Sequence, residues 1–214
     1  MTIDKIYRLI ADFTSKVVGG YISPTQFNDY AEMACVNVMR KYFPQTPEAL
    51  RFATTERVSN DLNALKKVAA LTTNVSGQIT TPADYYNVLK ITATATGDKI
   101  DVVEIYQEDD RVGSALLPTS TGKIAVNYIN FFQIHPIANN VAITFVYIKK
   151  PATPVYAYTV VSGRPVYDSG SSVQHEFQNM AEIDFMQEII KFVAPHLKDA
   201  DLLQFSNVVK QEHV

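Results

Sequence analysis

The sequence has few of the residues that most often bind metals or carry out covalent catalysis. Among its 214 residues there is one cysteine, Cys35, and there are four histidines. A single cysteine excludes a disulfide within the chain and a metal cluster built on thiolates. Cys35 falls among apolar positions of a predicted helix, where we interpret it as a small core residue. No histidine has a second ligand at helical metal-site spacing except His196, which Asp199 follows, and that pair lacks a third ligand.

Catalytic signatures are missing as well. The sequence contains no G-x-S-x-G elbow, phosphate-binding Walker loop, dinucleotide fingerprint or H-E-x-x-H motif. Asp168, Ser169, Ser171 and His175 lie close together in the sequence, but the members of a hydrolytic triad usually come from separate elements. The acidic run at residues 108–111 lacks the oxygen spacing and central glycine of a calcium loop, so we predict a solvated turn there. We therefore expect no enzyme activity, cofactor or metal.

The charge balance is slightly acidic. The formal net charge is −3 and the isoelectric point is about 5.8, so no general basic field attracts nucleic acid. The N-terminal stretch MTIDKIYRLIADF carries four charged residues, which fits neither the apolar core of a signal peptide nor a membrane span. We expect the chain to stay soluble, without a secretion signal of its own.

The amounts of apolar and aromatic residues are those of a globular protein. Apolar residues make up 47%, with 12 tyrosines and 11 phenylalanines. The length allows one large domain or two small ones, which would bury about 70% of the surface of the unfolded chain.

Two helices are predicted at the N-terminus. Apolar residues recur at three- and four-residue steps over 3–17, until Gly19 and Gly20. The run Ser23-Pro24-Thr25-Gln26 then has the form of a capping box with proline at the first helical position, and the helix that it starts ends before Pro44. The spacing of Val58, Leu62, Leu65 and Val68 predicts a third helix.

The middle of the chain has the alternation of β-strands. Short β-rich runs start near residue 68, residues 99–105 form another predicted strand, and Asp84-Tyr85-Tyr86 is predicted to be a loop that presents aromatics. Residues 124–134 and 141–148 are predicted to pair as a hairpin with a wide turn. Both faces of 141–148 are largely apolar, so we expect a strand covered on both sides.

A stiff arm is predicted to follow that strand. Lys149 and Lys150 end the apolar pattern, and Pro151 and Pro154 cannot donate to a β-ladder, which favours an extended chain. Exposed tyrosines beside prolines are typical of protein interfaces. The candidate interface residues are Tyr85, Tyr86, Lys149, Lys150, Pro151, Pro154, Tyr156, Tyr158, Arg164 and Tyr167.

Helical spacing returns in the C-terminal part, with stripes over 180–193 and 202–209. Residues 171–214 hold seven acidic and three basic residues, whereas residues 1–70 hold nine basic and seven acidic ones. We predict an α+β fold: residues 1–70 and 171–214 form helices that pack together, and residues 71–170 form a central antiparallel, sandwich-like β domain with an extended arm at 149–165.

The order of several motifs resembles a known family. GGYISPTQFN, PADYYNV, EIYQEDDRVGSALLPT, VYIKKPATPVYAY and RPVYDSGSSVQHEF follow one another along nearly the whole chain. This succession is similar to virion structural proteins of crAss-like and related tailed phages of Bacteroidetes hosts. The aromatic after the second proline of the arm is often tryptophan in that family, whereas here it is Tyr156, which lacks the indole donor.

The resemblance implies a subunit of a ring in the head–tail connector, or neck, of the virion. Such rings contain identical copies, commonly twelve, dock to the portal protein and neighbouring ring or tail proteins, and let DNA pass as cargo, with no role for a membrane. The subunit would be made in the host cytoplasm and end in the virion. The alternative is a β-sandwich binding module on a tail or fibre that recognises a host glycan or protein. Helices at both ends of the chain favour the connector.

Overall fold

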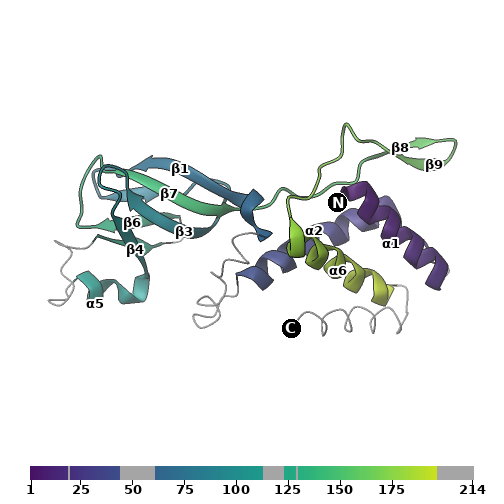
Figure 1. Ribbon diagram of the computed structural model, residues 1–214, viewed down its shortest axis with the longest axis horizontal. Coiled ribbons are helices and arrows are strands. Elements are labelled where there is room, and N and C mark those ends of the chain that lie inside the picture. The colour runs from purple at the N-terminus through teal and green to yellow at the C-terminus, as the bar shows by residue number, and fades with distance from the viewer. Residues whose placement is uncertain (19, 44–60, 113–122, 129, 197–214) are drawn as a thin grey trace. The chain divides into compact units, whose positions relative to one another are not determined.

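The fold was examined in a computed structural model that describes residues 1–18, 20–43, 61–112, 123–128 and 130–196 (Figure 1). The chain divides into two compact units. The helical unit comprises Met1–Ala64 and Pro151–Val214, and the β unit comprises Leu65–Lys150. The predicted α+β class is confirmed. Strand β1 begins at Lys66, four residues before the predicted boundary at residue 70, and the segment after Lys150 groups with the helices.

Three helices build the described part of the helical unit: α1 (Ile3–Val18), α2 (Pro24–Tyr42) and α6 (Asn179–His196). The predicted capping box is confirmed at the start of α2. The Ser23 hydroxyl accepts a hydrogen bond from the Gln26 backbone N–H at 3.3 Å, and Gln26 Oε1 accepts one from the Ser23 N–H at 3.1 Å. These two bonds satisfy N–H groups that no helical carbonyl can reach, and they fix where α2 starts.

The helical unit has an aromatic core. Phe27 and Phe185 are fully buried, and the Tyr7 ring meets Phe27 edge-on with centroids 5.2 Å apart. Helices α2 and α6 lie side by side: Tyr30 stacks on Phe192, and Lys41 forms an ion pair with Asp184. Apolar burial between helices from the two ends of the described chain therefore stabilises this unit.

In its described residues, the β unit forms a single mixed sheet of seven strands in the order β1-β7-β3-β4-β5-β6-β2. All neighbours are antiparallel except β4 and β5, which are parallel. A parallel pair needs a crossover connection. Here the connection contains the 3-10 turn η2 (Ile105–Gln107) and the short helix α5 (Glu108–Val112). The strands are β1 (Lys66–Thr72), β2 (Gln78–Thr80), β3 (Tyr85–Ala93), β4 (Lys99–Glu104), β5 (Ile124–Asn127), β6 (Phe131–His135) and β7 (Ala142–Lys149).

The sheet curls until it is almost a barrel, because the strands at its two ends are consecutive in the sequence. A turn at residues 73–77 joins β1 to β2, and the Gly77 carbonyl accepts a hydrogen bond from Ile134 on β6 at 2.9 Å. Gly77 has φ +73°, and a Cβ there would lie 3.1 Å from Gln133 Nε2 and 3.2 Å from the Ile134 carbonyl. Only glycine fits this turn without strain.

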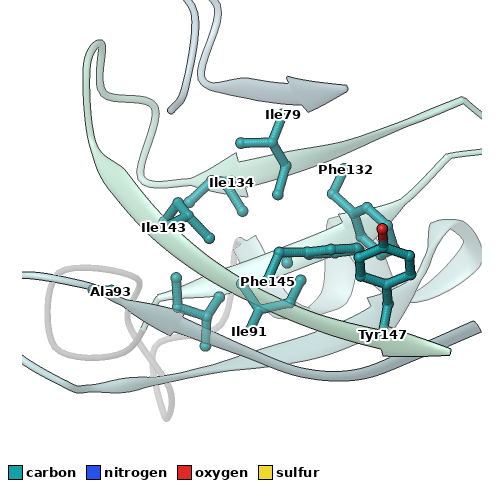
Figure 2. Packing of buried hydrophobic residues seen from close by; sticks show 10 residues of the cluster. Ile79, Ile91, Ala93, Phe132, Ile134, Ile143, Phe145 and Tyr147 are labelled. Atoms are coloured by element: carbon teal, nitrogen blue, oxygen red, sulfur yellow. The ribbon is translucent and has the colours of Figure 1, made fainter. Parts of the chain in front are cut away.

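One apolar core fills the inside of the curled sheet (Figure 2). Ile143, Phe145 and Tyr147 point into it from β7 and alternate with less buried residues. Phe145 lies 5.4 Å from Phe132 and 5.5 Å from Tyr147 between ring centroids, so aromatic rings fill one end of the core. The predicted strand at 141–148 is confirmed and has β1 and β3 as neighbours. Its second face is half-buried at Thr144 and Val146, not fully covered as predicted.

Several sequence predictions for this unit were wrong. The predicted third helix lies partly outside the described residues, and its prediction fails at Val68, which lies on β1 and is 67% exposed. The predicted strand at 124–134 is two strands, and β7 pairs with β1 and β3 instead of forming a hairpin with it. The predicted acidic turn at 108–111 is helix α5. The antiparallel prediction fails at β4–β5, and a sandwich of two sheets is not confirmed.

Candidate interaction surface

The predicted arm is not a free extension at its first part. Tyr156 is 4% exposed, and its ring centroid lies 4.3 Å from that of Tyr7 and 6.2 Å from that of Phe27. Burial raises the pKa of its phenol. Pro154 is also buried, and Pro151 is half-buried. These three candidates therefore belong to the core and flank of the helical unit, because apolar contact outweighs the extended tendency that prolines give the chain.

Two further candidates, Tyr85 and Tyr86, lie on strand β3 and not on a loop. The Tyr85 ring packs against Phe132 and Phe145 with centroids 6.0 and 5.8 Å away. Burial raises the pKa of Tyr85 to about 12. Tyr86 is half-buried. Tyr85 is half-buried and packs against the core, and the prediction of a presented aromatic pair was wrong.

The two candidate lysines end β7. Lys149 is the last residue of the strand and is half-buried. Lys150 is exposed, and its backbone N–H donates to the Asp84 carbonyl at 2.7 Å. The Asp84 carboxylate accepts hydrogen bonds from Lys67 Nζ at 2.6 Å and from the Tyr147 hydroxyl at 2.8 Å, which lower the pKa of Asp84. These contacts tie the end of β7 and the start of β1 to Asp84, which precedes β3.

The remaining candidates, Tyr158, Arg164 and Tyr167, lie together on a hairpin that the sequence analysis did not identify. Strands β8 (Tyr158–Val161) and β9 (Arg164–Tyr167) form a separate two-stranded sheet, drawn as a ribbon pair in Figure 1. Ser162 and Gly163 form its turn with φ values of +51° and +78°. Two positive φ values are the mark of a type I′ turn, whose twist matches that of paired strands.

The hairpin exposes apolar side chains to an unusual degree. Val160 is 67%, Val161 55% and Val166 47% exposed, and Tyr158 is 38% exposed. An isolated two-stranded hairpin is at best marginally stable in water. Contiguous exposed apolar residues are typical of a surface that binds another protein. Sequence reasoning missed the three valines, although alternating β-branched residues around Ser-Gly were a hairpin signal.

The register of the hairpin sorts its side chains onto two faces. Tyr158 pairs with Tyr167, and Val160 pairs with Pro165. Since alternate residues of a strand point to opposite sides, these four side chains share one face, which we call the apolar hairpin face. Its other side carries Thr159, Val161, Arg164 and Val166.

The apolar hairpin face is continuous with the core of the helical unit. The Tyr167 ring lies 5.1 Å from that of the buried Tyr156, and the Tyr167 hydroxyl accepts a hydrogen bond from Gln174 at 3.1 Å. At the base, the Asp168 N–H donates to the Ala157 carbonyl at 2.9 Å, and Ser172 Oγ accepts from the Ala157 N–H at 3.0 Å. The hairpin is therefore anchored at its base and exposed towards its tip.

The structure does not bring Asp168 and His175 together as members of a hydrolytic triad. The Asp168 carboxylate accepts a hydrogen bond from the Gly170 N–H at 2.9 Å, and hydrogen bonding from Ser171 lowers its pKa. The ring of His175 instead lies 5.4 Å from Phe185, and its Nε2 is 2.8 Å from the Met1 carbonyl oxygen. Burial lowers the pKa of His175. Asp168 closes a turn and His175 belongs to the helical packing.

A polar cluster in the β unit was also missed. Glu108 Oε1 on α5 lies 3.0 Å from His135 Nε2 on β6, and Glu108 Oε2 accepts a hydrogen bond from the Tyr128 hydroxyl. The hydrogen bond to Glu108 raises the pKa of Tyr128. These bonds hold α5 against the end of β6 and against Tyr128, the residue that follows β5. Among the described residues, no three histidine, cysteine, aspartate or glutamate side chains are grouped to hold a metal ion.

Two further observations bear on the nature of the chain. In the part that the structure describes, no helix is both long enough and apolar enough to cross a bilayer. No model of a protein family matches the chain, and no curated protein matches it.

The main candidate site is the β8–β9 hairpin, because it exposes Val160, Val161, Val166 and the apolar hairpin face.

Proposed function

We propose that this protein is a structural subunit of a tailed-phage virion that works by binding other subunits and not by catalysis. In this proposal the subunit belongs to a ring of identical copies, commonly twelve, in the head–tail connector, where it contacts the portal and neighbouring ring or tail proteins. DNA passes through the ring as cargo. The motif order described above supports the phage assignment, and the exposed hairpin supports the interaction role.

The observation that carries the proposal is the exposure of the β8–β9 hairpin. Val160 and Val161 at its end are 67% and 55% exposed, while Tyr167 at its base packs on buried Tyr156. A closed ring needs one surface of each subunit to meet a different surface of its neighbour. An anchored hairpin with an apolar face is suited to that role, because its base is already ordered and docking costs less conformational entropy.

Charge gives less support for the ring contact. The opposite charge balances of residues 1–70 and 171–214 suggest complementary faces, but Lys41 of α2 pairs with Asp184 of α6 inside one subunit. The apolar hairpin is therefore the preferred contact. The net charge of −3 fits a ring lining that lets DNA slide, because an acidic subunit does not attract phosphate.

Mass photometry and negative-stain imaging of the purified chain test this proposal, alone and with a portal protein. We expect one discrete species at a whole-number multiple of 23.9 kDa, seen as a ring with a central channel. In a triple variant, Val160, Val161 and Val166 are changed to threonine, which keeps β-branching and replaces one exposed methyl group of each side chain by a hydroxyl. This variant should remain folded and lose at least tenfold in the affinity of subunits for one another.

The matched control changes Val75 to threonine, since Val75 is 77% exposed but lies in the β1–β2 turn. The control should assemble like the unchanged protein. A chain that stays monomeric at all concentrations and with portal, and instead binds a glycan, would contradict the connector role and favour the tail- or fibre-associated module. An assembly that the triple variant leaves intact would contradict the hairpin as its contact.

A further inference from the structure

The backbone of the hairpin has one edge that can accept a further strand and one that cannot. With a two-residue turn, Val161 and Arg164 exchange hydrogen bonds, and so do Thr159 and Val166. Every second residue pair is thus hydrogen-bonded, and the next such pair is Ala157 and Asp168, where the Asp168 N–H donates to the Ala157 carbonyl at 2.9 Å. The backbone groups of the intervening residues therefore point outward, from Val160 and Tyr158 on β8 and from Pro165 and Tyr167 on β9.

Proline closes the β9 edge. Pro165 stands at an outward position, where its missing N–H removes a donor that a partner strand would need. On β8 the outward N–H and C=O groups of Tyr158 and Val160 are intact, and no described residue pairs with them. The hairpin can therefore accept a further strand along β8 but not along β9.

The β unit also has one long open edge. Strand β1 is the first strand of the sheet order, and among the described strands it pairs with β7 alone. The Thr73 N–H donates to the Val141 carbonyl, so the register directs the backbone groups of Leu71 and Ala69 towards β7. Those of Val68 and Ala70 point outward. Lys66 and Lys67 occupy the start of β1 and leave residues 68–71 as the unprotected part of the edge.

The opposite end of the sheet order is much less available. Strand β2 has three residues, and the Asn74 N–H donates to the Gln78 carbonyl at 2.9 Å. A three-residue strand that starts opposite Asn74 extends no further than Thr72 of β1. The outward groups of Val68 and Ala70 therefore lie beyond its reach, and the Val68 side chain is 67% exposed.

We propose that the outer edge of β8 in one copy of the chain pairs with the outer edge of β1 in a second copy and extends its sheet by two strands. This inference rests on the proposed function, in that it takes the partner to be another copy. Among the described strands, β8 and β1 each have an edge with no partner strand. They also contain no proline, unlike β9, and are longer than the three-residue β2. Because β8 and β1 are different surfaces of the same subunit, their pairing is head-to-tail. Contacts of this kind can close into a ring of identical copies.

Proline substitution tests each edge separately. Val160→Pro removes an outward N–H from β8, as Pro165 does on β9. It leaves the hairpin ladder intact, because the Val160 N–H takes no part in it. Val68→Pro does the same on β1. We expect each variant alone to lose at least tenfold in self-association measured by mass photometry. An equimolar mixture should form a dimer and nothing larger, because one intact β8 edge meets one intact β1 edge. Val160→Thr and Val68→Thr are controls that keep the N–H, and each should lose much less self-association than the proline variant at the same position.

Cysteine crosslinking gives a second measurement that does not depend on the proline variants folding. In a Cys35→Ala background, Val160→Cys is combined with Val68→Cys or with Ala70→Cys, since cross-strand neighbours lie within disulfide reach. We expect oxidation to link different chains into a ladder of multimers. Val166→Cys with Val68→Cys is the control and should give no ladder, because Val166 lies on the closed strand.

Four results would overturn the inference. Crosslinks between two Val160→Cys chains without a β1 cysteine would show pairing of hairpin with hairpin. A crosslink confined within monomers would show that the edges meet inside one chain. Rings that persist unchanged in both proline variants would leave the proposed function standing and remove strand addition as its contact. Absence of any oligomer in the unchanged protein, with portal present, would reject the proposed function and the inference together.

Discussion

The side-chain amide of Asn28 on α2 binds both backbone groups of Tyr156. Asn28 Oδ1 accepts a hydrogen bond from the Tyr156 N–H at 2.8 Å, and its Nδ2 donates to the Tyr156 carbonyl at 3.2 Å. The amide thus pairs with the segment as a neighbouring β-strand would. It fixes the place at which the chain that returns from the β unit packs on the helices, two residues before β8 begins.

Replacing Asn28 by alanine should therefore destabilise the helical unit. Two hydrogen bonds are lost and two half-buried backbone groups are left without partners, so we expect a loss of about 1–3 kcal/mol in the free energy of unfolding. Urea denaturation followed by circular dichroism measures this. Asn28→Asp keeps the acceptor and should cost less. A loss below about 0.5 kcal/mol for Asn28→Ala would show that the amide is not structural.

Tyr156 and Tyr158 are two residues apart and should respond differently to truncation. Tyr156→Ala opens a cavity beside Tyr7 and Phe27 and should cost about 3–5 kcal/mol of stability. Tyr158 is 38% exposed, and Tyr158→Ala should cost less than about 1 kcal/mol while weakening self-association. Thermal melts and mass photometry on both variants give the comparison. Equal losses of stability would contradict the division between a buried Tyr156 and a hairpin-face Tyr158.

Gly77→Ala should destabilise the β unit. Its φ of +73° is unfavourable for alanine by about 1–2 kcal/mol, and the new methyl group would lie 3.2 Å from the Ile134 carbonyl. We expect a loss of at least about 1 kcal/mol in urea denaturation. Gly97→Ala is a matched control, because Gly97 has φ +75° with no atom within 4 Å of its Cβ position. The difference between the two variants isolates the steric contact with β6, and no difference would mean that the turn adapts freely.

The buried phenol of Tyr85 should make the β unit less stable at high pH. Its pKa is raised to about 12 in the folded protein, from a value of 10.0. The unfolded chain therefore loses this proton first, so the stability that Tyr85 contributes is complete below pH 10 and falls as pH rises from about 10 to about 12. The loss reaches roughly 2–3 kcal/mol.

Comparison of the unchanged protein with Tyr85→Phe isolates this effect, because other buried tyrosines act in the same direction in both. Urea denaturation at pH 8, 10 and 11.5 should show a smaller decline for the phenylalanine variant. Absorbance titration of the phenols should show one fewer late-ionising group. Identical declines would mean that Tyr85 titrates as an exposed tyrosine.

Local signals in the sequence predicted elements well where the decisive interactions are themselves local. The start of α2 depends on bonds between Ser23 and Gln26, three residues apart, and was predicted correctly. Strand β7 was recognised from its β-branched and aromatic residues. By contrast, the pairing of β7 with β1 and β3 and the parallel β4–β5 pair depend on contacts distant in the sequence, which the alternation of residues does not encode.

The candidate site was predicted in part for the same reason. Pro151 and Pro154 favour an extended chain, but whether such a chain is free or docked depends on Asn28 and Tyr7, more than a hundred residues away. Tyr85 was mistaken for a loop residue because Pro82 and Asp84 suggest a turn. The hairpin could have been predicted, since Ser162-Gly163 between β-branched residues is a local signal.

The most direct test of the central claim is the mass distribution of the purified protein at rising concentration, compared with that of the Val160, Val161 and Val166 triple threonine variant. Our account predicts that the unchanged chain forms one discrete ring-sized species and that the folded variant remains monomeric at the same concentrations. An unchanged chain that stays at 23.9 kDa throughout, alone and with portal, would contradict it.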